Sequence, residues 1–172
     1  MSPRPMTRHR IWSFGADVDT DALAPGAWMQ HGIEVVASHC LETVEPRFAR
    51  EVQRGDVLVA GANFGIGSSR EQAAAALVHL GVAAVIAPSY GGLFFRNAFN
   101  LGLLLLTSPD TVALRGQSHL RLDRDGPQLQ TEDGQPLAVE PVPDFLLHMV
   151  HAGGLMAVLR QRVVPTTPVI TS

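Results

Sequence analysis

The chain has 172 residues, of which 46% are hydrophobic and 17% charged, a composition typical of one globular domain with an apolar core. Its 13 basic residues are all arginine and its net charge is −3, which argues against a nucleic-acid or membrane-surface binder. The single cysteine, Cys40, excludes an intrachain disulfide and a cysteine-rich metal site, and we expect it to be a plain buried residue.

The two ends of the chain are expected to lie outside its one domain. Residues 1–10 are basic and lack the apolar run of a secretory signal, which predicts a disordered tail. The domain is expected to span 11–162, and a second tail 163–172. No apolar stretch reaches the ~20 residues that a membrane helix needs, which predicts a cytoplasmic protein.

The first third of the domain contains short elements. Residues 11–14 predict a strand that enters an acidic turn over 15–28. Residues 33–37 are apolar and predict a second short strand, whereas 46–55 predict a short helix that ends at the glycine.

Residues 56–107 alternate compact apolar runs with longer helical segments, and a glycine-rich loop follows the first run. The expected elements are strands over 56–60, 82–87 and 103–107 and helices over 68–80 and 93–101. This alternation predicts an α/β fold with a parallel βαβαβ core.

The remaining residues predict a different local structure. Residues 118–139 alternate polar and apolar side chains around two Asp-Gly turns, which predicts a β-meander. A last helix is expected over 144–161, with a break at Gly153 and Gly154. His148 and His151 lie on that helix, but two ligands are too few for a metal site, so no metal site is predicted.

The end of the glycine-rich loop carries the clearest chemical signal. Ser68 or Ser69 is positioned to cap the following helix, with Glu71 or Gln72 completing a capping box. Arg70 has the wrong charge for a helix N-terminus, so it is expected to bind an anionic ligand or to pair with an acidic side chain.

Better-known motifs do not fit these residues. A Walker loop needs a lysine, and a dinucleotide fingerprint needs glycine where Arg70 stands. The acidic turn is not a calcium loop, because Ala22 and Trp28 occupy the positions of the required glycine and glutamate. No G-x-S-x-G nucleophile elbow is present.

Three segments together resemble the small subunits of 3-isopropylmalate dehydratase, which correspond to the swivelling C-terminal domain of aconitase. They are FGADVDTDALAP at 14–25, GANFGIGSSREQAA at 61–74 and VAAVIAPSYGGLFFRNAFNLGLL at 82–104. The resemblance extends over about 11–162. It implies a swivelling β/β/α domain and a hydro-lyase that interconverts 2-isopropylmalate and 3-isopropylmalate in leucine biosynthesis.

The resemblance also implies roles for particular residues. Ser68 would be the base that exchanges the α-proton of the substrate, while Ser69 and Arg70 would support its oxygen and the substrate carboxylate. Thr20 and Asp21 would lie at the same active site. A serine oxygen can act as a base only where its negative charge is stabilised, as beside an arginine in a dry site.

The cofactor implied is a 4Fe–4S cluster held by cysteines of a separate large subunit, without which the chain would be inactive. The substrate implied is a 2-hydroxy di-acid. The chain departs from the family at Ile66, where cysteine is frequent, and at Gln72, where histidine is frequent; neither residue is catalytic in the resemblance.

The segment after Pro25 is expected to contact the variable part of the substrate through Trp28 and Gln30. No arginine occurs between residues 11 and 46, which argues against a substrate with a third carboxylate. The alternatives are the small subunit of a dimethylmalate dehydratase or homoaconitase, or a non-catalytic anion-binding module. An intact Ser-Ser-Arg sequence argues against the last of these.

Overall fold

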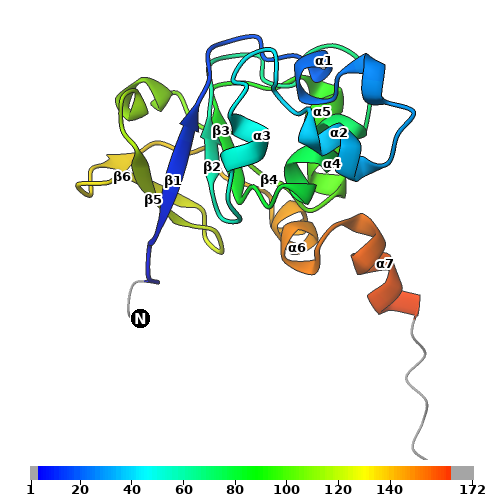
Figure 1. Cartoon of the computed structure of the whole chain (residues 1–172). Coiled ribbons are helices and arrows are strands. Elements are labelled where there is room, and N and C mark those ends of the chain that lie inside the picture. The colour runs from blue at the N-terminus through cyan, green and yellow to red at the C-terminus, as the bar shows by residue number, and fades with distance from the viewer. Residues whose placement is uncertain (1–3, 164–172) are drawn as a thin grey trace, which may run out of the picture.

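The computed structural model describes residues 4–163, and within them the strands form a single sheet (Figure 1). The strands are β1 (Thr7–Ser13), β2 (Val57–Val59), β3 (Ala84–Ala87), β4 (Leu104–Thr107), β5 (His119–Asp123), β6 (Gln128–Thr131) and β7 (Pro136–Leu137). Their order is β4-β3-β2-β1-β5-β6-β7. The first four strands run parallel and the last three antiparallel, which confirms the predicted parallel core and meander.

The helices lie mainly between the parallel strands in sequence. They are α1 (Thr20–Leu23), η1 (Gly26–Trp28), α2 (Ile33–Ser38), α3 (Phe48–Glu51), α4 (Gln72–His79), α5 (Gly92–Asn100), η2 (Thr111–Leu114), α6 (Asp144–Ala152) and α7 (Leu155–Val163). Helix α4 joins β2 to β3 and packs against α1, α2 and α5 (Figure 1). Within residues 4–163, no helix has both the length and the apolarity to cross a membrane.

Strand β1 divides its pairing between two partners. Its first four residues pair antiparallel with β5, from Thr7 opposite Leu122 to Arg10 opposite His119. Its last three residues, from Ile11, pair parallel with β2. One strand therefore joins the parallel and antiparallel halves of the sheet.

The core is centred on the parallel strands. All residues of β2 and β3 are buried, which their uninterrupted apolar sequences explain, because strands covered on both faces have no polar side to present. Phe48, Phe64, Phe94 and Phe99 fill the space between sheet and helices at 2% exposure or less. Each such side chain contributes about 1.5–3 kcal/mol through its burial.

Several expectations from the sequence are wrong. The helix expected over 46–55 forms only at Phe48–Glu51 and ends four residues before Gly55. Residues 33–37 form helix α2 rather than a strand. Gly32 is the N-cap of this helix, and the helix packs against α4 with Val36 and Ala37 buried. The tail expected over 1–10 is wrong for residues 7–10, which lie in β1. Residues 1–3 and 164–172 lie outside the described part of the chain, whereas Val163 is still helical.

The last helix breaks where the two glycines predicted it. Helix α6 ends at Gly153, which adopts a left-handed conformation with φ of 91° and donates its N–H to the carbonyl of Val150. Helix α7 begins two residues later. The predicted helix over 144–161 is therefore two helices.

Asp56 holds the beginning of β2 to β1. Its Oδ2 accepts hydrogen bonds from Arg10 Nη2 at 2.6 Å, Trp12 Nε1 at 2.9 Å and the backbone N–H of Gln53 at 2.9 Å. The side chain is 7% exposed. Burial raises the pKa of this carboxyl, but the bonds from Arg10, Gln53 and Trp12 outweigh it and leave the pKa below its usual range.

Asp56→Asn is therefore expected to lower the free energy of unfolding at pH 7 by about 1.5–3 kcal/mol, the range for hydrogen bonds to a charged group. A depressed folded-state pKa gives stability that is present above the unfolded-state value of ~4 and is lost as the pH falls through the folded-state value. Denaturant unfolding measured from pH 7 into the acid range should show this loss in the wild type and a smaller one in Asp56→Asn. Glu34→Gln, at an exposed carboxylate, is the control and should leave the acid loss unchanged.

Candidate functional site

Two loops run side by side at the carboxyl ends of the parallel strands. One follows β1 and the other follows β2. Gly65 N donates to Val18 O at 2.7 Å, and Thr20 N donates to Ile66 O at 2.8 Å, while Asp19 and Ile66 form a parallel bridge. These backbone contacts bring the Thr20-Asp21 segment next to the Ser-Ser-Arg segment, although nearly fifty residues separate them in sequence.

Four of the predicted side chains form one hydrogen-bonded cluster. Ser68 Oγ lies 3.2 Å from Thr20 Oγ1 and accepts a hydrogen bond from Arg70 Nε at 2.8 Å. Arg70 Nη1 donates to Asp21 Oδ1 at 3.0 Å and to the carbonyl of Ala24 at 2.8 Å. We call Thr20, Asp21, Ser68 and Arg70 the serine–arginine cluster.

The cluster needs a glycine at position 67. Gly67 has a φ of 114°, and a Cβ built there would lie 2.9 Å from Thr20 Oγ1. A side chain would therefore push away the hydroxyl that accepts the backbone N–H of Ser68 at 3.0 Å. Both the backbone angle and the close approach of Thr20 therefore explain the glycine at this position.

The capping prediction for Ser68 and Ser69 is wrong. Helix α4 begins at Gln72, and its N-cap residue, Glu71, makes no side-chain cap. Ser68 Oγ instead interacts with Thr20 and Arg70. Ser68, which the sequence predicted as a cap, therefore makes tertiary contacts before the helix begins.

Arg70 pairs with an acidic side chain. The sequence predicted either such a pair or an anionic ligand for this arginine. That partner, Asp21, comes from the opposite loop and is itself held by the N–H of Gly26 at 3.2 Å. The Arg70 side chain is 24% exposed and that of Asp21 70%. A guanidinium that donates to the Ser68 oxygen stabilises negative charge on that oxygen, and the stabilisation grows when water is excluded.

Within residues 4–163, the side chains of the other three predicted residues form no hydrogen bond or ion pair with the cluster. The carbonyl of Ser69 accepts a hydrogen bond from Asn97 Nδ2 at 3.1 Å, while its side chain is exposed. Trp28 stacks on His39 with ring centroids 3.8 Å apart, and Gln30 is exposed. Asn97 was not singled out for the site, because a polar residue on a helix surface gives no sign in sequence of a partner in another loop.

The chain's own residues do not fit an iron–sulfur cluster. Cys40, the single cysteine, is 0% exposed, and burial raises the pKa of its thiol far above the usual range, so it is no thiolate ligand. Within residues 4–163, no three His, Cys, Asp or Glu side chains are grouped to bind a metal.

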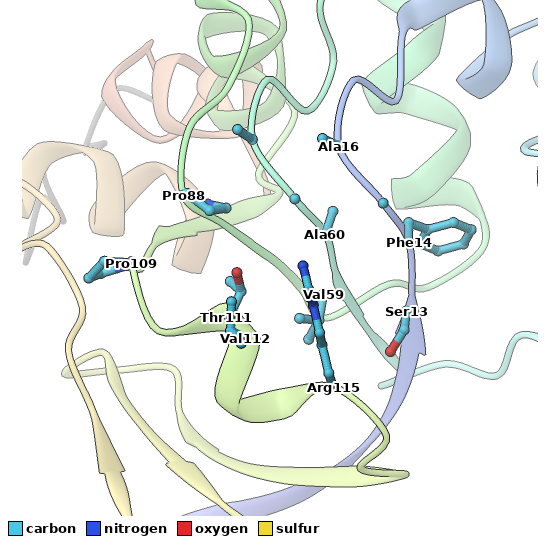
Figure 2. Close-up of a pocket in the computed structure, with 13 residues that line it drawn as sticks. Ser13, Phe14, Ala16, Val59, Ala60, Pro88, Pro109, Thr111, Val112 and Arg115 are labelled. Carbon is cyan, nitrogen blue, oxygen red and sulfur yellow. The ribbon is translucent and has the colours of Figure 1, made fainter.

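The serine–arginine cluster is open to solvent on this chain. Its members Ser68 and Asp21 are exposed and Arg70 is partly so, whereas Thr20 is buried. A cavity of about 400 Å³ lies near the ends of the same strands, but its lining contains no member of the cluster (Figure 2). A dry reaction site at Ser68 therefore requires a second surface to cover it.

Comparisons with known proteins show which family the chain resembles. Residues 26–111 match the model of the aconitase C-terminal domain family. The "3-isopropylmalate dehydratase small subunit 1" of Methanopyrus kandleri is 40% identical, covering 92% of this chain and 95% of its own length. The "methanogen homoaconitase small subunit" of Methanothermobacter thermautotrophicus is also 40% identical, covering 87% and 88%. The crystal structure of 3-isopropylmalate dehydratase from Methanocaldococcus jannaschii superimposes with a TM-score of 0.82 at 35% identity, covering 92% and 95%.

Proposed function

Since the chain belongs to the aconitase C-terminal domain family as a small subunit of a hydro-lyase, we propose that it serves 3-isopropylmalate dehydratase and interconverts 2- and 3-isopropylmalate with a large subunit. The observation that carries the proposal is the hydrogen bond from Arg70 Nε to Ser68 Oγ, because it gives a serine oxygen the electrostatic support that a base requires. The exposure of this cluster supports a partner that covers it.

In this proposal Ser68 Oγ, as the alkoxide, takes the α-proton of the substrate and returns it during rehydration. Arg70 stabilises the alkoxide through Nε and leaves Nη2, which has no recorded protein partner within residues 4–163, for a substrate carboxylate. Thr20 and Asp21 hold these two side chains, and Ser69 lines the substrate. The 4Fe–4S cluster that such a reaction uses belongs, in this proposal, to the large subunit.

The choice of substrate is proposed from the segment after Pro25. Trp28 is a large, half-buried apolar side chain, Gln30 is neutral, and no arginine occurs between 11 and 46. A carboxylate buried without a charged partner costs several kcal/mol, whereas an alkyl group gains about 0.8 kcal/mol per buried CH₂. The segment therefore favours an isopropyl group over the third carboxylate of homocitrate.

The reconstituted complex is expected to turn over isopropylmalate with a kcat/KM at least ~10-fold above that for homocitrate or citrate, since the difference involves more than ~1.4 kcal/mol. The assay compares these acids and dimethylmalate with the loaded large subunit present, and with each subunit alone as a control. Preference for homocitrate would favour the second candidate, a homoaconitase small subunit, which the Methanothermobacter relative supports.

The substitution Gln30→Arg tests whether this chain determines which substrate the complex prefers. The new guanidinium can bind a third carboxylate through two parallel hydrogen bonds, so the preference for isopropylmalate should narrow or reverse. Arg160→Gln, at an exposed position of α7, is the control for a change in the number of arginines. It should leave the ratio of the kcat/KM values for the two substrates unchanged. An unchanged ratio in Gln30→Arg would exclude this segment from the substrate site.

A further inference from the structure

The cavity of about 400 Å³ at the carboxyl ends of the parallel strands is separate from the serine–arginine cluster. It lies between the residues that follow β1, the residues that follow β2, and the η2 turn after β4 (Figure 2). In open α/β sheets, small molecules bind outside the carboxyl ends of the strands. The cavity lies at this edge of the sheet, where β1 and β2 end.

Three polar side chains line this cavity, those of Ser13, Thr111 and Arg115. Arg115 extends between Thr111 on one side and Ser13 on the other, with its nitrogen-bearing end inside the cavity (Figure 2). None of the three side chains has a recorded hydrogen bond or ion pair within residues 4–163. Thr111 is 7% exposed, and its hydroxyl is accessible at the cavity surface, because the described residues contain no buried polar side-chain atom without a partner. No acidic side chain lines the cavity, and its single formal charge is positive.

The rest of the lining is apolar. Val59, Ala60, Pro88, Pro109 and Val112 surround the polar group. Val112 is 61% exposed and lies in the cavity wall, where an aliphatic ligand would cover it. One guanidinium and two hydroxyls match the planar, singly charged carboxylate, and the apolar wall matches a short hydrocarbon chain.

We propose that this cavity binds a small monocarboxylic acid with a short aliphatic chain, held by Arg115, Thr111 and Ser13. The site is distinct from that of the hydro-lyase reaction, since the two share no residue. Both nevertheless involve the same pair of loops, which continue from Ala16 to Thr20 and from Gly61 to Ser68. The carboxylate binds at Arg115, and the hydrocarbon covers Val112.

The test is a titration of the ¹⁵N-labelled full-length chain, followed by amide chemical shifts, with 3-methylbutanoate as the probe. Saturable shifts are expected at Ala16, Gly61 and Val112. Acetate lacks the hydrocarbon and 3-methylbutan-1-ol lacks the charge, so each should bind at least ~10-fold more weakly.

Arg115→Gln should weaken binding of 3-methylbutanoate by at least ~10-fold, because it removes the charge while an exposed glutamine leaves the fold intact. Arg160→Gln removes an exposed arginine on α7 and should bind as the wild type does. Unchanged affinity in Arg115→Gln, equal binding of acetate, or shifts confined to Ser68–Arg70 would each overturn the proposal.

Discussion

Ser68→Ala is expected to lower the turnover of the reconstituted complex by at least ~10²-fold, because it removes the oxygen that transfers the proton. KM should change little, since Arg70 keeps its bonds to Asp21 and to the carbonyl of Ala24. Steady-state kinetics with isopropylmalate, together with exchange of the substrate α-proton in deuterated water, measures both effects.

The same substitution should leave the fold almost unchanged. Ser68 is exposed and does not cap α4, so the loss of its hydroxyl should cost at most ~1 kcal/mol. Ser38→Ala is a matched control at an exposed serine on α2, whose hydroxyl, among the residues that the structure describes, bonds only to the carbonyl of Val35. Near-normal turnover in Ser68→Ala, with the control also normal, would show that Ser68 is not the base.

Gly65→Ala should destabilise the chain by about 2–5 kcal/mol, a large part of the ~5–15 kcal/mol available to a domain. Gly65 has a φ of 78°, which a side chain rarely adopts. Its added Cβ would also lie 2.2 Å from Cγ of Phe94, a core side chain that has no room to withdraw. Thermal and denaturant unfolding of the isolated chain measures the loss.

Gly92→Ala is the control for this substitution. Gly92 lies in the first turn of α5, has an ordinary φ, and has nothing within 4 Å of an added Cβ. Its replacement should be neutral or stabilise the helix by up to ~1 kcal/mol. If Gly65→Ala unfolds at the same temperature as Gly92→Ala, Phe94 moves aside at little cost and the packing argument fails.

The sequence predicted the elements whose pattern is local. The apolar runs predicted as strands over 56–60, 82–87 and 103–107 form the buried strands β2, β3 and β4 within one or two residues of those bounds, and the glycines at 81, 102 and 153 marked helix ends. Residues 7–10 were missed because their polar sequence becomes a strand only when β5 pairs with it. Residues 33–37 were predicted as a strand because β-branched side chains favour strands. They form a helix that packs against α4, a tertiary contact that the local sequence does not reveal.

The structure brings four of the seven predicted side chains into one hydrogen-bonded cluster, but the sequence did not predict how they interact. Residue type and the family resemblance together singled out the four members of the serine–arginine cluster. Nothing in the spacing showed that Arg70 would bond to Ser68 and Asp21 at once, or that Asn97 would hold the Ser69 carbonyl. Such contacts depend on how two loops from different strands meet, which is a tertiary property.

The divided pairing of β1 has a consequence for how the chain is made. During synthesis β1 leaves the ribosome first, but the partner of its first half, β5, follows more than a hundred residues later. Until then the nascent chain exposes an unpaired strand edge, the kind of surface through which chains aggregate. Pairing at such long sequence separation is also slow, because a large loop must close first. We therefore expect closure of β1 onto β5 to be the late step of folding.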